Sequence, residues 1–259
     1  VSSYSQFLEV FGPASTFTMP EVRQAFQNGI AEVVVSAVSG GTTGTAVLTD
    51  SESATVATLT ARAAGPWSGG IKVTVTQRGT PATGVDITIG YGDAQETFRN
   101  LAADQIVTTL TNLSALLSAE KGTSTELPEA GTTPLSAGTH PVANDYTTAI
   151  DRLELDPGID MVMASMQDFA ATNLNPDKVH AAIEAHCRTQ SEAAHNRIGF
   201  GTVAPATEGD PTAIVAKAGT LASDRFVLVA PHGVLGAVAG LIGGLSYYES
   251  PTFKRLSGV

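Results

Sequence analysis

Hydrophobic residues in the first 40 positions predict a helix followed by a strand. The helix is centred on Pro20–Asn28, where Pro20 suits the first turn and Gly29 suits the stop. The valine-rich run Glu32–Val38 has the composition of a strand. Together the two elements fit an α/β layer.

The pattern changes after Ser39. Short alternations rich in Thr, Val and Gly are typical of antiparallel strands joined by turns, and they continue through Val73–Gln77 and Val85–Tyr91. A helix is expected over Ala103–Ala119, and the Pro/Gly/Thr-rich stretch Glu126–Pro141 predicts a loop and a domain boundary. The helical spacing rests on Ile106, Leu110, Leu113 and Leu117.

Helical and strand patterns alternate from Asn144 onward. The expected helices are Tyr146–Leu153, Pro176–His195, Pro211–Leu221 and Leu235–Tyr247, and the expected strands are Met161–Ser165, Ile198–Val203 and Phe226–Ala230. Such alternation with short connections predicts a largely parallel sheet covered by helices. The fold class is therefore α/β with mixed α+β character. We expect a discontinuous α/β layer, residues 1–40 plus 140–259, with residues 41–139 inserted as a β-rich protruding domain that carries one helix.

Three glycines recur every four residues in the last of these helices. Gly236, Gly240 and Gly244 fall near one helical face. Because glycine is costly inside a helix, a stripe of this kind predicts very close packing against a neighbouring backbone.

Composition narrows the classes of function. With 42% hydrophobic residues the chain can bury a substantial core. A formal charge of −11 and the lack of a basic run argue against direct binding to nucleic acid. The single Cys187 excludes an internal disulfide.

The apolar stretch Phe226–Leu245 is interrupted by Pro231 and His232, and the remaining apolar residues are too few to cross a bilayer, so no membrane span is expected.

The usual signatures of an α/β enzyme are incomplete. The run Gly40-Gly41-Thr42-Thr43-Gly44 lacks the end of a phosphate loop and the spacing of a dinucleotide fold, so a flexible junction is expected. Ser246 has no glycine two positions later, which excludes a nucleophile elbow. His232 lies beyond the end of a predicted strand, where α/β proteins place ligands, and with Gly201 it marks a candidate ligand region.

One predicted helix carries three potential metal ligands on one face. His180, Glu184 and Cys187 occupy positions i, i+4 and i+7, but no fourth ligand is signalled, and cysteine is often buried as a small hydrophobic residue. His186 lies on another face, and His195 comes at the helix end, where a cation suits the dipole.

Two carboxylate-rich segments complete the search for chemistry. Their carboxylates could hold a divalent cation or form an acid–base pair; the segments are Asp156-Pro157-Gly158-Ile159-Asp160 and Glu208-Gly209-Asp210-Pro211. Turns and helix starts are, however, a sufficient explanation of their Asp-Pro and Pro-Gly steps. We therefore predict no catalytic, cofactor-binding or metal-binding residues and no enzyme activity.

Three separated blocks resemble one protein family. The C-terminal block is Ala239-Gly240-Leu241-Ile242, then Ser250-Pro251 and Lys254–Val259. The first block is Val1–Gly12, followed by Val22–Gly29 and the valine run, and the middle block is Leu59–Val73 with Gly65-Pro66-Trp67 at its centre. In this order they resemble contractile tail sheath proteins of bacteriophages and related contractile injection systems. The chain departs from that pattern at Ser68-Gly69-Gly70, where many relatives have Gly-Asn.

The resemblance implies a structural role. Sheath subunits polymerise helically around a tail tube and contract to drive injection, so the expected partners are other sheath subunits, the tail tube protein, and baseplate and tail terminator proteins. The expected location is the virion tail, after assembly in the host cytoplasm, and no cofactor is implied. The chain is expected to be a fragment without the N-terminal arm and the C-terminal domain of the family, and by itself a folded monomer or weak oligomer.

Two alternatives stay open at this point. One is an α/β ligand-binding or enzymatic domain with a site at strand ends near His232, which a deep pocket with titratable groups would favour. The other is a surface-array or adhesion module, a role that the Thr/Gly-rich insertion would suit equally.

Overall fold

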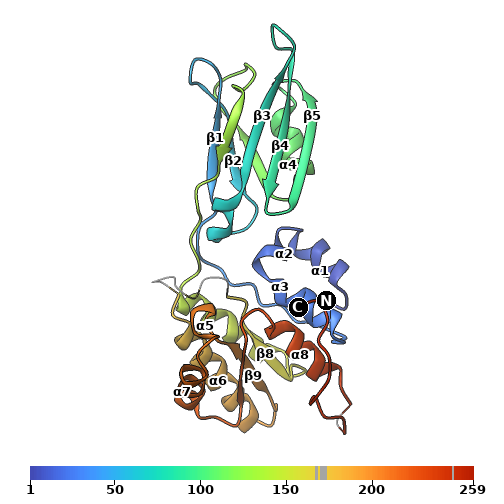
Figure 1. Cartoon of the computed structure of the whole chain (residues 1–259), viewed down its shortest axis with the longest axis vertical. Helices are drawn as coiled ribbons and strands as arrows, with labels where there is room; N and C mark the ends of the chain where they lie inside the picture. The colour runs from blue at the N-terminus through green and yellow to red at the C-terminus, as the bar shows by residue number, and fades with distance from the viewer. Residues whose placement is uncertain (167–168, 170–173, 247) are drawn as a thin grey trace. The chain divides into compact units, whose positions relative to one another are not determined.

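Figure 1 shows the computed structural model of the chain, which describes residues 1–166, 169, 174–246 and 248–259. The chain divides into two units, one made of residues 1–40 and 141–259 and the other of residues 41–140. The first unit combines helices with a parallel sheet, and the second is built mainly from antiparallel strands. The predicted mixed α/β class is confirmed.

The first unit is organised around a three-stranded parallel sheet in the order β10-β9-β8. Its strands are β8 (Met161–Met163), β9 (Ile198–Thr202) and β10 (Phe226–Val229). Its helices are α1 (Tyr4–Phe11), α2 (Ser15–Thr18), α3 (Pro20–Gln27), α5 (Ala143–Asp151), α6 (Pro176–Glu192), α7 (Pro211–Leu221) and α8 (Leu235–Gly244), with short 3₁₀ turns η2 (Arg152–Leu155) and η3 (Pro205–Thr207). The parallel sheet covered by helices is as predicted.

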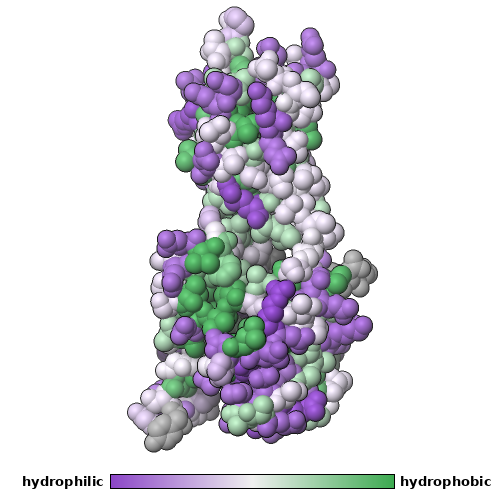
Figure 2. All heavy atoms as spheres, turned by 180° about the vertical axis from the view of Figure 1, so that it is seen from behind, coloured by the Kyte–Doolittle hydropathy of each residue, from purple (hydrophilic) through white to green (hydrophobic). Residues whose placement is uncertain are grey.

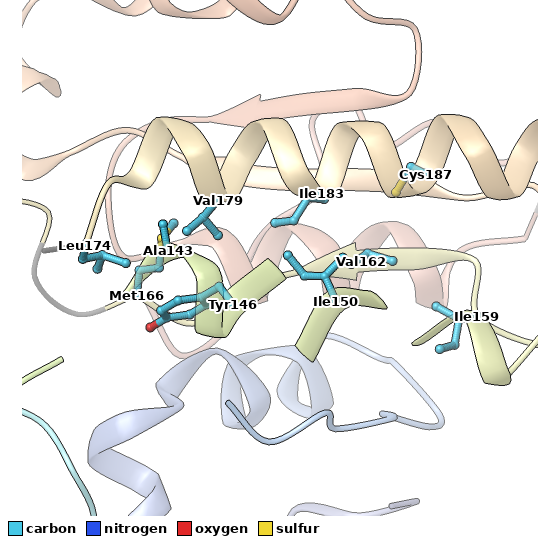
Figure 3. Packing of buried hydrophobic residues seen from close by; sticks show 10 residues of the cluster. All are labelled: Ala143, Tyr146, Ile150, Ile159, Val162, Met166, Leu174, Val179, Ile183 and Cys187. Atoms are coloured by element: carbon cyan, nitrogen blue, oxygen red, sulfur yellow. The ribbon is translucent and has the colours of Figure 1, made fainter. Parts of the chain in front are cut away.

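Alternation along the strands sorts side chains between two faces of this sheet. Val162 of β8 joins the hydrophobic cluster formed with α5 and α6, and Figure 3 shows Val179, Ile183 and Cys187 of α6 directed toward it. Met161 and Met163 pack instead with Phe200, Val229 and residues of α8. The sheet is therefore covered by α6 on one face and by α8 on the other.

Glycines on β9 let α6 approach the sheet closely. A Cβ on Gly199 would lie 2.5 Å from Ile183 Cγ2, and a Cβ on Gly201 would lie 2.7 Å from two atoms of the His180 ring. Phe200, between them, points to the opposite face and is 2% exposed. The Gly-Phe-Gly sequence thus packs small residues under α6 and a large one under α8.

The glycine stripe of α8 packs against the backbone of α3. A Cβ on Gly236 would come within 2.2 Å of Glu21 O, one on Gly240 within 2.4 Å of Ala25 O, and one on Gly244 within 2.9 Å of Gly29 O. The contacted residues on α3 and at its end are themselves spaced by four. The predicted close packing of the stripe against a neighbouring backbone is confirmed.

The second unit contains two antiparallel sheets, in the orders β1-β2-β6 and β5-β4-β3-β7. Its elements are β1 (Thr45–Thr49), β2 (Thr55–Ala61), η1 (Pro66–Gly70), β3 (Lys72–Arg78), β4 (Gly84–Tyr91), β5 (Ala94–Leu101), α4 (Ile106–Leu113), β6 (Leu117–Lys121) and β7 (Gly131–Pro134). The predicted strands at Val73–Gln77 and Val85–Tyr91 are confirmed as parts of β3 and β4. Trp67 in η1 is 7% exposed, meets Tyr91 edge to face at 5.2 Å, and donates from Nε1 to Ala64 O. It anchors a turn to a core, as expected.

The predicted helix Ala103–Ala119 is wrong at its C-terminal half. Helix α4 ends at Leu113 because the Ser114 hydroxyl accepts from Leu117 N at 3.2 Å and donates to Glu96 Oε2 at 2.7 Å. Leu117 then belongs to β6, where it pairs with Ala61. The capping carboxylate comes from β5, so local periodicity could not reveal the break. The predicted loop Glu126–Pro141 also contains the short strand β7.

The predicted strand Glu32–Val38 is not formed. Within the described residues, only Val33 of this segment exchanges backbone hydrogen bonds, with Val1, at 2.8 and 2.9 Å. The segment is irregular in its pairing and takes no place in the parallel sheet, because that sheet ends at β8 and β10. Residues with high strand propensity form a strand only where a neighbouring strand is available for pairing.

Several helix ends also differ from the prediction. Helix α6 stops at Glu192, three residues before His195, because Ala194 turns into a left-handed conformation at φ 67°. Helix α5 begins at Ala143 and passes into η2, and α8 ends at Gly244. Tyr247, the predicted end of the last helix, lies outside the described residues. Across the part of the chain that the structure describes, no helix combines the length and apolar character needed to cross a membrane.

Candidate interaction surface and strand-end region

The strand-end region around His232 is held by backbone contacts. The His232 ring donates from Nδ1 to Val203 O at 3.2 Å, and its own backbone N–H donates to Glu208 Oε2 at 3.1 Å. Phe169 meets the ring edge to face at 5.0 Å. The carboxylate of Glu208 therefore orders the backbone after β10, while the imidazole itself is fixed by a carbonyl.

Gly201, the other candidate at the strand ends, is covered. His180 of α6 and Phe226 of β10 fill the space beside it, so the position serves packing between helix and sheet. His180 is 1% exposed, and neither ring nitrogen has a hydrogen-bond partner within the described residues. Burial lowers the pKa of His180 to about 4, which keeps the ring neutral at physiological pH.

The three candidate ligands on α6 do not converge. His180 and Cys187 are buried against the sheet, whereas Glu184 pairs with Arg188 at 3.4 Å one turn further along the helix. Burial raises the pKa of Cys187 to about 11, so its thiol stays protonated. Among the described residues no group of three or more His, Cys, Asp or Glu side chains could hold a metal ion.

The carboxylate-rich segments serve turns and caps. Asp156 Oδ1 accepts from Gly158 N at 3.0 Å within a tight turn. Asp210 Oδ1 caps α7 by accepting from Thr212 N and Ala213 N at 2.9 and 3.1 Å. The turn and helix-start interpretation of both residues is confirmed.

A partly buried carboxyl group, that of Glu21, links three elements and was not signalled by the sequence. Ser165, just beyond β8, donates from its hydroxyl to Glu21 Oε2 of α3, and the Tyr146 hydroxyl donates to Ser165 O at 3.1 Å. Burial raises the pKa of Glu21, and burial with the nearby Glu21 and Asp145 charges raises the pKa of Tyr146 to about 12. The trio joins α3, α5 and the end of β8.

Arg197 is a fully buried cation that the sequence also did not signal. Its guanidinium donates from Nη1 to Leu153 O at 3.0 Å and to His186 Nε2 at 2.7 Å, and from Nη2 to Asp156 O. Burial, followed by the Arg197 charge, lowers the pKa of His186, consistent with a neutral ring that accepts this bond. A buried charge needs compensating polar partners. Here two carbonyl groups and the His186 ring supply them to the Nη atoms, whereas Nε has no partner among the described residues. The guanidinium thereby fixes the backbone of residues 153–156.

Residues Ser250–Arg255 form an exposed loop between α8 and the last residues of the chain, and we call this loop the tip. It begins beyond α8, and the chain after it is fastened to the end of α3: Asn28 donates from Nδ2 to Ser257 O at 2.9 Å and accepts from Ser257 N at 2.8 Å. All side chains of the tip are exposed, and Phe253 is 100% exposed. The tip is therefore an exposed loop whose far end is fixed to the end of α3.

Apolar side chains also gather on the surface of the first unit. Figure 2 shows, from behind, a continuous hydrophobic area on this unit, in the lower half of the view. Exposed apolar residues of the unit include Val10 (61%), Val34 (46%) and Leu155 (81%). Contiguous apolar areas on a surface commonly mark contacts with other proteins.

Comparison with known proteins supports the fold. No protein-family model matches the chain, and no curated protein matches it. Among solved structures, a sheath tail protein from Desulfitobacterium hafniense is similar with a TM-score of 0.51 and 15% identity over 89% of this chain and 50% of that chain. A sheath tail protein from Listeria innocua has a TM-score of 0.48 and 14% identity over 96% of this chain and 53% of that chain. The chain thus spans about half the length of each, and it has a sheath-like fold.

Proposed function

We propose that the protein is a structural subunit of a contractile tail sheath that polymerises helically around a tail tube and contracts to drive the tube into a target. The observation that carries this proposal is the fold shared with the sheath tail protein of Desulfitobacterium hafniense over 89% of this chain. The three sequence blocks that resemble the family add support, because they occur in the same order and are widely separated in the sequence.

In this proposal the activity belongs to interfaces between subunits. Rearrangement of packed bodies releases stored free energy, and no catalytic centre takes part. The proposed partners are other sheath subunits, the tail tube, and baseplate and terminator proteins, and the proposed location is the virion tail after assembly in the host cytoplasm. The alternative ligand site near His232 gains no support, because the Gly201 side is filled by His180 and the imidazole is engaged by a carbonyl.

The direct test is to express the complete open reading frame that contains this chain and to image the product by negative-stain electron microscopy. Hollow striated tubes are the expected result. Discrete globular particles at high protein concentration would contradict the proposal and would direct attention to ligand screens around His232.

We also propose that residues 41–140 form an inserted domain that folds independently of the α/β layer. The two chain crossings are adjacent, since Thr42 and Thr139 exchange backbone hydrogen bonds at 3.1 and 3.2 Å. Residues 41–140 expressed alone should give one cooperative unfolding transition. A polypeptide that lacks such a transition would show that the β-rich unit depends on the rest of the chain.

A further inference from the structure

Val1 and Val33 form a single pair of an antiparallel ladder. Val1 N donates to Val33 O at 2.8 Å, and Val33 N donates to Val1 O at 2.9 Å. When two residues exchange both backbone bonds in this way, they make the hydrogen-bonded pair of antiparallel strands. The pair also fixes the direction and the register of any further pairing along the two chain segments.

The ladder can lengthen in one direction only. The side chain of Ser3 caps α1 by accepting from Gln6 N at 3.1 Å, so the chain leaves the ladder soon after Val1. On the facing segment, Ile30 N donates to Ala25 O at 3.3 Å and belongs to the end of α3. Further pairs can therefore form only between residues 34–38 and a strand that leads into Val1.

Residues 34–38 have the composition of a strand but lack a partner for it. Valine is enriched in strands, and this segment contains Val34, Val35 and Val38. Within the part of the chain that the structure describes, no backbone N–H or C=O of residues 34–38 takes part in a hydrogen bond. Half-buried positions such as Val35 and Ser36 normally have paired backbone groups. The segment thus has unused backbone donors and acceptors.

Side-chain contacts hold this segment in place. Ser36 donates from its hydroxyl to Ala149 O of α5 at 2.7 Å. Val38 packs against the hydrophobic cluster that α5 and α6 form with β8. A segment that is fixed in this way loses less conformational freedom when a partner binds.

We infer that residues 33–38 are one strand of an antiparallel pair, and that the second strand is the polypeptide joined to the amino group of Val1 in the complete open reading frame. The existing Val1–Val33 pair identifies this occupant. A strand from another molecule would run into Val1 and would have to leave the ladder there. A strand that continues into Val1 keeps the direction and register already set. Main-chain hydrogen bonds of this kind are a general source of affinity between extended segments.

The register predicts which backbone groups pair. Since hydrogen-bonded and non-hydrogen-bonded positions alternate in an antiparallel ladder, Val35 and Ala37 point their N–H and C=O groups at the added strand, as Val33 does. The same groups of Val34 and Ser36 point to the other edge. An added strand of about six residues is long enough to reach Ala37 and Val38.

Amide hydrogen exchange resolved by NMR tests this pairing. The 259-residue chain is compared with the same chain preceded by about six residues that the reading frame encodes before Val1. The extension should slow exchange at Val35 and Ala37 by at least about tenfold and should leave Val34 and Ser36 nearly unchanged. An extension of equal length made of Gly and Ser is the control and should give little protection, because it forms strands poorly.

Two proline variants of the extended chain make a matched pair. Val35→Pro removes an N–H that faces the added strand, so the protection of Ala37 should be lost. Val34→Pro removes an N–H that faces away and favours an extended conformation at Val33, so the protection of Ala37 should remain. Equal behaviour of the two variants would contradict the register.

Three further results would overturn the inference. Exchange at Val35 and Ala37 that the natural extension does not change would exclude the added strand, and so would a reading frame that encodes no residues before Val1. Protection that rises with the concentration of the 259-residue chain would show that a second copy supplies the strand. The inference concerns the first unit alone, and the sheath role is decided separately by whether the complete product forms tubes.

Discussion

Helix α8 and the tip that follows it use unusual backbone positions in opposite ways. In α8, glycines stand where the backbone of α3 leaves no room for a side chain, and each loses helical propensity in exchange for packing. In the tip, a phenylalanine stands where the backbone favours glycine, and its side chain is fully exposed. The first arrangement is explained by packing inside the molecule, whereas packing against the described residues does not explain the second.

The largest expected effect tests the interior half of this comparison. Gly240→Ala places a methyl group 2.4 Å from Ala25 O and 2.6 Å from Ala25 Cα, and a backbone cannot shift as a side-chain end can. We expect a loss of more than about 3 kcal/mol in the free energy of unfolding, despite the better helix propensity of alanine. Urea unfolding measures it.

The matched control is the same substitution on another helix. A methyl group added at Gly219 of α7 would have no atom within 4 Å, so Gly219→Ala should stabilise the protein by about 0.5 to 1 kcal/mol. Equal effects at the two glycines would mean that the α3–α8 contact is looser than described.

The next effect concerns His180, whose ring fills the space beside Gly201 as the backbone of α3 fills the space beside the glycines of α8. Its pKa is lowered to about 4 by burial, against 6.5 in the unfolded chain. Between these values the unfolded state binds the proton and the folded state does not. Stability from this group is therefore complete above pH 6.5 and decreases as the pH falls toward 4, by up to about 3 kcal/mol.

Urea unfolding at several pH values, for wild type and His180→Leu, measures this contribution. The difference in unfolding free energy between the two proteins should change toward acid in favour of the variant. Parallel pH profiles would show that His180 gains a proton without cost, for example through local opening of α6.

How much of this could be predicted depends on where the determining contact lies. The spacing of Gly236, Gly240 and Gly244 is a local signal, and its packing role was predicted correctly. The end of α4 depends on Glu96, a residue of strand β5. The hydrophobic periodicity alone therefore predicted a helix that continued through Leu117. Strand composition at residues 32–38 was also insufficient, because pairing requires a neighbour.

The environment of Arg197 and the backbone angle at Phe253 were the least predictable features. Nothing near Arg197 in the sequence indicates that its guanidinium is fully buried and holds carbonyls more than 40 residues earlier, at separations of 41 and 44. The positive φ of Phe253 likewise has no signal in the sequence. Long-range hydrogen bonds and single backbone angles leave no periodic trace in one sequence.

A smaller effect tests how firmly Arg197 holds the backbone of residues 151–160. Arg197→Met removes the donors to Leu153 O and Asp156 O while keeping apolar bulk, so two carbonyls lose their partner. We expect a loss of about 2 kcal/mol in unfolding free energy and faster amide hydrogen exchange in residues 151–160. Arg188→Met, at an exposed position on α6, is the control and should change neither quantity appreciably. Unchanged exchange in Arg197→Met would mean that this backbone is held by other contacts.

The smallest expected change in unfolding free energy has the opposite sign and concerns Phe253 in the tip. Phe253→Gly relieves a left-handed conformation but adds freedom to the unfolded chain, so the two terms nearly cancel. The unfolding free energy should stay the same or rise by about 1 kcal/mol at most, which thermal and urea unfolding together can resolve. A clear loss of stability would show that Phe253 packs within its own chain. An unchanged or increased stability would show that the Phe253 side chain adds nothing to the folding of its own chain, as its full exposure indicates.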